Sequence, residues 1–206
     1  MKIKPSLWLA LILAASAAKT TAQLFTLEPD NFANATVLNH ASSQVSLVTA
    51  GANNLPIPFN VTASYDGFDY ASTGTNVFGH AGGIPFWNTN RRLRMDFTTP
   101  ANFIAIDFIG GEYFSLEVAR LDVFSSAGTL LDSYTSAPRP SDSVETMFIS
   151  RPAGDIAWAV AYLPPDGGSF GRFDHLQFSV VPEPSLGGFL LVAITAASTI
   201  RRREWR

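Results

Sequence analysis

"LRMDFTTPANFIAIDF", from Leu93 to Phe108, is the stretch that decides the fold of this 206-residue chain. Apolar and charged residues alternate as far as Phe97, and a second alternation begins at Ile104. A period of two is typical of β-strands with one buried face. Thr98-Thr99-Pro100, between the two runs, is a turn signal. The stretch therefore predicts two strands joined by a turn.

Similar runs occur toward the C-terminus. "GDIAWAVAYL" places Ile156, Trp158, Val160 and Tyr162 on one face and only alanines on the other, so we expect this strand to be covered on both sides. "LDVFSSAGTLLDSY" predicts two strands joined at Ala127-Gly128, and "FDHLQFSVV" predicts a last strand. Strands separated by short turns predict one antiparallel β-sandwich, jelly-roll-like, over residues 23–181. The order of these runs is also similar to jelly-roll modules of the carbohydrate-binding, galactose-binding-like kind.

The N-terminus predicts export. Lys2 and Lys4 precede an apolar run from Leu7 to Ala18, and small residues follow up to Ala22. This order is typical of a signal peptide, here residues 1–22. The alternative is an uncleaved anchor.

The C-terminus holds an uncharged run, residues 186–200, followed by Arg201, Arg202 and Arg203. As a helix it would reach about 22 Å, whereas a bilayer core is about 30 Å thick. Thinning of the bilayer tolerates such a mismatch, and the arginines favour a cytoplasmic end. We therefore expect a short transmembrane helix; the alternative is a buried core helix with a basic end.

Pro182-Glu183-Pro184, the apolar run and the arginines together resemble the PEP-CTERM sorting signal of Gram-negative bacteria, although Glu204-Trp205 interrupts the basic end. The resemblance covers residues 182–206. It implies recognition by a membrane enzyme, exosortase, and processing near Pro-Glu-Pro. It also implies an inner-membrane precursor, a final place at the cell surface or in the extracellular matrix, and a context of exopolysaccharide and biofilm.

Composition narrows the function of residues 23–181. This span has seven arginines, no lysine and 15 acidic residues, a net charge of −8, so no basic footprint for nucleic acid is present. The chain has no cysteine, which excludes disulfides and thiolate chemistry. An acidic domain with only oxygen ligands is compatible with Ca²⁺.

Two kinds of site are predicted. Glu28 and Asp30 near the mature N-terminus are calcium ligands in our interpretation, joined by Asp174, because the first and last strands of jelly rolls are often neighbours. Aromatic residues in loop-like sequence are candidates for stacking on sugars, although such rings are also common in cores. These candidates are Tyr65, Phe68, Tyr70, Trp87 and Tyr113.

Catalytic motifs are weak in this sequence. "GGSFG" at 167–171 matches G-x-S-x-G, but a Pro-Pro-Asp-Gly turn precedes it and a strand-like run follows, unlike a nucleophile elbow. His40, His80 and His175 show no zinc spacing. We therefore expect a non-catalytic exported protein, structural or polysaccharide-associated. The alternatives are a secreted glycan-active hydrolase and an adhesin that binds proteins through a strand edge.

Overall fold

The computed structural model describes residues 22–180, except 66, 68, 69, 112–114 and 142. The described residues from Gln23 onward belong to one compact unit, Gln23–Val181. Residues 1–21 of the predicted signal peptide and the whole predicted sorting tail, 182–206, lie outside the described residues. Within the described part, no helix has the length and apolarity needed to cross a membrane.

The described residues form an all-β structure, apart from a three-residue 3₁₀ helix, η1 (Pro29–Asn31). Each of the strand pairs is antiparallel, which confirms the predicted class. The strands are β1 (Gln23–Leu27), β2 (Val45–Ala50), β3 (Val61–Tyr65), β4 (Asn76–His80), β5 (Arg92–Gly110), β6 (Arg120–Phe124), β7 (Leu130–Thr135), β8 (Val144–Ser150), β9 (Ile156–Tyr162) and β10 (Gly171–Val180).

The turn predicted at Thr98-Thr99-Pro100 is wrong, because β5 runs through these residues as one strand of 19 residues. The pairing of β5 with β9 skips from Asp96 to Ala101, so the residues between these two have no paired partner in β9. Pro100 has no N–H to donate, and it is tolerated at such an interruption. The sequence signal marks a bend inside a strand rather than the end of one.

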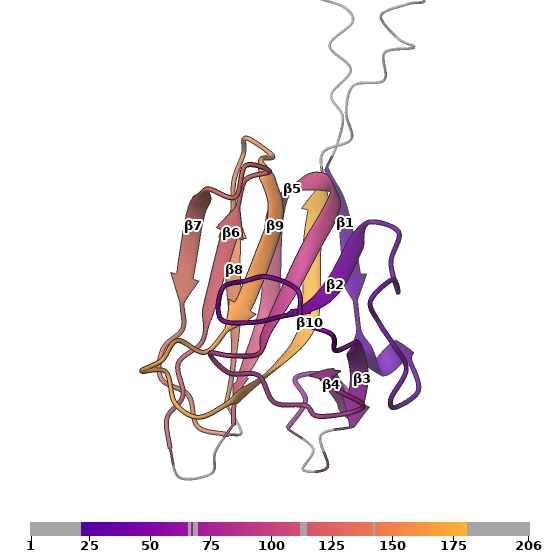
Figure 1. Cartoon of the computed structure of the whole chain (residues 1–206), viewed down its shortest axis with the longest axis vertical. Coiled ribbons are helices and arrows are strands. Elements are labelled where there is room, and N and C mark those ends of the chain that lie inside the picture. The colour runs from indigo at the N-terminus through magenta and orange to yellow at the C-terminus, as the bar shows by residue number, and fades with distance from the viewer. Residues whose placement is uncertain (1–21, 66, 68–69, 112–114, 142, 181–206) are drawn as a thin grey trace, which may run out of the picture. The chain divides into compact units, whose positions relative to one another are not determined.

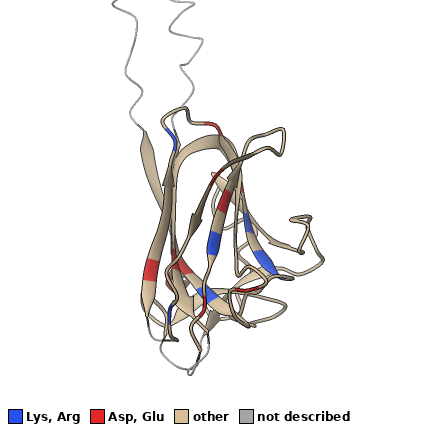
Figure 2. Cartoon of the chain, turned by 90° about the vertical axis from the view of Figure 1, so that its left-hand side faces the viewer, with Lys and Arg blue, Asp and Glu red and all other residues tan. Residues whose placement is uncertain are grey.

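This bend carries β5 from one layer of the fold to the other (Figures 1 and 2). The first half of β5 pairs with β2 and β9, and β9 continues to β6 and β7. The second half pairs with β8 and β10, and β10 continues to β1, β4 and β3. The two layers are thus one hydrogen-bonded network folded over at β5, an arrangement consistent with a β-sandwich.

The core lies between the layers. Its buried residues come from both, for example Met95 and Leu121 from one layer and Phe108 and Leu176 from the other. Phe178 of β10 stacks on Phe25 of β1, with ring centroids 5.3 Å apart, and its centroid lies 5.2 Å from that of Phe97 in β5. These rings join the two layers near the bend.

Three local predictions are confirmed. β6 and β7 form the predicted hairpin, in which Gly128 has a φ of 79°, a conformation that favours glycine. β10 is the predicted last strand, over residues 171–180. β9 is covered on both sides: Ala159 and Ala161 face the main core, and Val160 and Tyr162 form a second buried cluster with Phe124 on the other face.

Replacement of Phe178 by alanine should lower the free energy of unfolding by about 3 to 5 kcal/mol, because a fully buried ring leaves a cavity. Phe148→Ala is the matched control, since Phe148 is 53% exposed, and it should cost about 1 kcal/mol or less. Urea unfolding of both variants tests this. Equal losses would contradict the described core.

Candidate functional site

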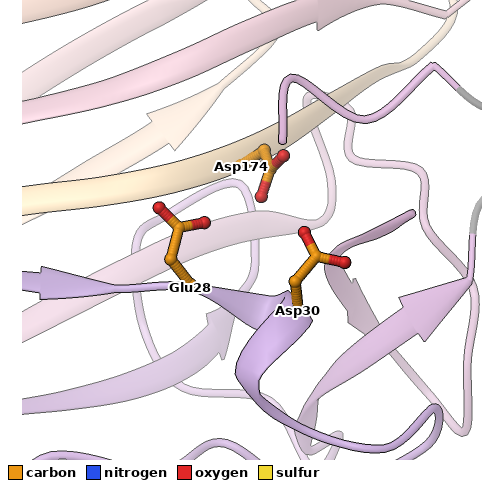
Figure 3. A group of neighbouring side chains, drawn as sticks. All are labelled: Glu28, Asp30 and Asp174. Carbon is orange, nitrogen blue, oxygen red and sulfur yellow. The ribbon is translucent and has the colours of Figure 1, made fainter. Parts of the chain in front are cut away.

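Three carboxylates from the two ends of the domain converge beside η1 (Figure 3). β1 pairs with β10, with Leu27 opposite Leu176, so the chain after β1 arrives next to Asp174. Glu28 and Asp30 then follow, and each of the three residues offers an oxygen within 4.8 Å of the other two. The residues predicted as calcium ligands are therefore brought together by the β1–β10 ladder.

The segment before β4 encloses these carboxylates. The backbone N–H groups of Ser72 and Thr73 donate to Asp174 Oδ2 at 3.0 and 3.1 Å. The Thr73 hydroxyl donates to Glu28 Oε2 at 2.8 Å. These bonds hold residues that are far apart in the sequence in one cluster.

Asp30 is held from the same segment. Thr75 and Asn76 donate their backbone N–H groups to Asp30 Oδ1 at 2.8 and 2.9 Å. Gly74, with a φ of +53°, leaves the space that Asp30 fills, because a Cβ at this position would lie 2.3 Å from the Asp30 Cγ. The absence of a side chain at position 74 is thus part of the geometry of the cluster.

His175 distorts the last strand at this point. Its φ of 47° is unusual for a residue with a side chain, and the register of β10 against β5 shifts between Asp174 and Gln177. In this conformation His175 donates its backbone N–H to Asp174 Oδ1 at 2.8 Å, and its Nδ1 pairs with Glu28. The bulge therefore fixes two of the three carboxylates.

Burial raises the pKa of Asp174 to about 6, because a carboxylate with no exposed surface loses its hydration. The hydrogen bonds from Thr73, His175 and Ser72 oppose this shift, and the nearby Glu28 carboxylate adds to it. The charged form of Asp174 is thus costly without a compensating cation.

The cluster fits Ca²⁺. Two oxygens bound to one calcium ion at 2.3–2.6 Å lie at most about 5.2 Å apart, and the three carboxylates satisfy this limit. Because Asp174 is buried, this cluster does not supply the two accessible carboxylates that glycoside hydrolysis needs.

Among the described residues, the predicted sugar-stacking aromatics differ in their exposure. Trp87 was the wrong choice: it is fully buried, and its Nε1–H donates to the Phe78 carbonyl at 2.6 Å. Tyr65 is 49% exposed at the end of β3, and Tyr70 is half-buried with its ring 5.2 Å from the guanidinium carbon of Arg172. Phe68 and Tyr113 lie outside the described residues.

A second candidate site, which sequence analysis missed, lies on the outer side of the layer formed by β5, β9 and β6. We call it the arginine–aromatic face and define it by Arg92, Arg94, Asp122, Phe124, Trp158 and Tyr162. Four of these residues, Arg92, Asp122, Phe124 and Tyr162, are buried, so Arg94 and the partly buried Trp158 form its accessible part. The sequence does contain a pattern that indicates this face. In each of these strands the charged and aromatic residues occupy alternate positions, so they all lie on the same side of the sheet.

Stacking orders this face. Trp158 lies between Phe124, at 3.8 Å and nearly parallel, and the guanidinium carbon of Arg94, 4.2 Å from its ring centroid. Such cation–π contacts are worth about 0.5 to 2 kcal/mol each. The guanidinium groups of Arg92 and Arg94 also bind Asn54, in the segment after β2. Arg94 donates to the Asn54 carbonyl at 2.9 Å, and Arg92 donates to the Asn54 side chain at 2.8 Å.

Ion pairs complete the face. Arg94 binds Asp96 at 2.7 Å, and Arg120 binds Asp122 at 2.6 Å. The Tyr162 hydroxyl donates to Asp122 at 2.9 Å. The side chains of Arg94, Asp96 and Arg120 keep 18%, 36% and 34% of their surface exposed, so the solvent side of the face is polar and already ordered.

No family model and no curated protein matches the sequence. Among solved structures, the chain is similar to the K2 cleaved adhesin domain of Lys-gingipain, with 14% identity, a TM-score of 0.48, and coverage of 76% of this chain and 99% of that one. It is also similar to the C-terminal family 22 carbohydrate binding module of Clostridium thermocellum Xyn10B, with 14% identity, a TM-score of 0.41, and coverage of 72% and 92%. At this level of similarity, neither match says what this chain binds.

Millimolar Ca²⁺ should stabilise the protein at pH 7.5 relative to EDTA. At a hundredfold excess over Kd the gain is about 2.7 kcal/mol, which for a chain of this size raises Tm by roughly 5 to 10 °C. Asp174→Asn should remove the response, and Asp132→Asn, an exposed residue outside the cluster, should keep it. Gly74→Ala, which changes no charge, should weaken the response by displacing Asp30. Superimposed melting curves for the native protein would contradict the site.

The calcium response should also depend on pH. Because the pKa of Asp174 is raised to about 6 in the folded, ion-free protein, this group favours the folded state when protonated. That contribution is fully present below the ordinary carboxyl pKa of about 3.9 and is lost as pH rises through about 6. Calcium needs the charged form, so its Tm increment should be large at pH 7.5 and shrink below pH 6. Melts at pH 7.5, 6 and 5, each with and without Ca²⁺, measure this; a constant increment would refute it.

Proposed function

We propose that this chain is a non-catalytic exported protein that associates with polysaccharide at the cell envelope or in the extracellular matrix. The observation that carries the proposal is the arginine–aromatic face. Its charged groups are already paired and stacked, so a ligand would not have to order them. Preorganisation of this kind reduces the entropy lost on binding.

The charge pattern of the face favours a ligand rich in hydroxyl groups. Segments of both signs occur along the strands (Figure 2). Arg94 is paired with the exposed Asp96 and Arg120 with the buried Asp122, so the exposed edge offers Arg94 and Arg120 as donors and Asp96 as the acceptor, each with its charge compensated. Sugar hydroxyls can use both, whereas a polyanion such as nucleic acid would need unpaired cations.

The candidate calcium site is compatible with a place outside the cell. Extracellular modules often bind Ca²⁺ with a Kd of about 10⁻⁴ to 10⁻³ M. A site of three carboxylates near the chain ends would then be filled only after export. Calcium would act on stability, because the cluster joins η1 to β10 and does not lie on the arginine–aromatic face.

We further propose that residues 182–206 sort the protein. The three parts of this tail agree in their physical roles. The two prolines would disfavour a helix at Pro182-Glu183-Pro184. The short apolar run would hold the chain in the bilayer, and the arginines would stop it from being pulled through. A permanent membrane anchor would not need the Pro-Glu-Pro sequence before the apolar run.

Polysaccharide binding can be tested with a glycan array and with sedimentation of insoluble polysaccharides, with and without Ca²⁺. Trp158→Ala removes the ring on which Arg94 rests, so we expect the affinity for the bound glycan to fall at least tenfold. Phe148→Ala removes an exposed ring from β8 and is the matched control. Unchanged binding by the Trp158 variant, or absence of any bound glycan, would refute the proposal.

Tail processing can be tested by mass spectrometry of the native protein from a host that encodes exosortase. We expect residues 186–206 to be absent from the mature protein. Glu183→Ala should leave the uncut form in the inner membrane, and Glu204→Ala, an acidic residue of the same tail outside the tripeptide, should be processed normally. Recovery of a mature surface protein that ends at Arg206 would show that the segment is an ordinary anchor.

A further inference from the structure

A surface hollow of about 220 Å³ lies at one end of the arginine–aromatic face. Val118, Arg120, Thr135, Pro164 and Asp166 line it. Arg120 stands opposite both Tyr162 of β9 and Thr135 of β7 in the strand register, so the hollow continues the row of side chains that begins at Tyr162.

The polar groups that line the hollow have hydrogen-bonding capacity left for a ligand. Arg120 uses its Nε for Asp122 and its Nη2 for Ser133, which fixes the guanidinium plane and leaves Nη1 without a partner among the described residues. Within the residues that the structure describes, the Asp166 carboxylate and the Thr135 hydroxyl also make no hydrogen bond. One fixed donor, one acceptor and one hydroxyl thus surround the same space.

Two backbone hydrogen bonds hold one wall of the hollow. Gly167 donates its N–H to the Pro164 carbonyl at 2.9 Å, and its own carbonyl accepts from the Val118 N–H at 2.7 Å. A Cβ at position 167 would lie 2.4 Å from the Val118 carbonyl oxygen, so only glycine allows this close approach. The turn that carries Asp166 is therefore held against the strand that leads into Arg120.

We propose that this hollow is a subsite for one neutral sugar unit. Its volume is below the roughly 300–1,000 Å³ of pockets for drug-sized ligands, which suits a single ring. Val118 and Pro164 give an apolar floor for ring C–H groups, while Asp166 accepts from hydroxyls and Arg120 donates to ring or hydroxyl oxygens. The charge of Arg120 is already compensated by Asp122, so the free Asp166 carboxylate disfavours an acidic sugar. The choice of ligand class rests on the proposed function; the position of the site rests on the hollow alone.

Saturation-transfer NMR on the full-length chain, purified in a detergent without a sugar headgroup, tests the subsite. The probes are glucose, galactose, mannose, rhamnose and N-acetylglucosamine, with glucuronate as the acidic comparison. We expect transfer to at least one neutral sugar, and at least a fivefold weaker apparent affinity in Asp166→Asn and Thr135→Val. Asp132→Asn makes the same change of charge on β7 outside the lining of the hollow and should bind as the native chain does.

Each other result overturns the subsite. If no neutral sugar shows transfer, the subsite does not exist. If all variants bind equally, the sugar binds elsewhere on the protein. If only glucuronate shows transfer, the ligand is not a neutral sugar. Sedimentation of polysaccharide by the same variants reports on the proposed function separately. A chain that still binds polysaccharide after Asp166→Asn would keep that function and lose only this subsite.

Discussion

The antiparallel ladder of β5 is the constraint on which the rest of the fold depends. This strand supplies hydrogen-bonding edges to β2 and β9 before its bend and to β8 and β10 after it. The phase of its alternation decides which side chains face the core in both layers. Leu93 and Met95 point inward, so Arg92 and Arg94 must point outward, and the arginine–aromatic face follows from that choice.

Much of the fold could be predicted because a period of two is a local property. The hairpin at Gly128, the doubly covered β9 and the last strand all follow from short stretches of sequence. The bend at Pro100 could not be predicted, because a turn between strands and a corner within a strand use the same residues. Only the partners on either side, which come from distant parts of the chain, distinguish the two.

The two candidate sites also differ in how far they could be predicted from the sequence. The carboxylate cluster was accessible to sequence reasoning because it depends on one long-range relation, the pairing of the first strand with the last. The choice of Trp87 failed because an aromatic residue in loop-like sequence can still be buried by the sheet beside it, here through the bridge to Gly171. Trp158 was overlooked because alternation alone does not tell which face of a doubly covered strand is the main core.

The pairing of Gln23 with Val180 has a mechanical consequence. β10 is the last strand of the described residues, and it lies between β5 on one side and β1 on the other over its last residues. A pull on its C-terminal end along the strand loads both ladders in shear, so their hydrogen bonds resist together instead of opening one after another. A load applied at this end of β10 would therefore pass into the sheet through two ladders at once.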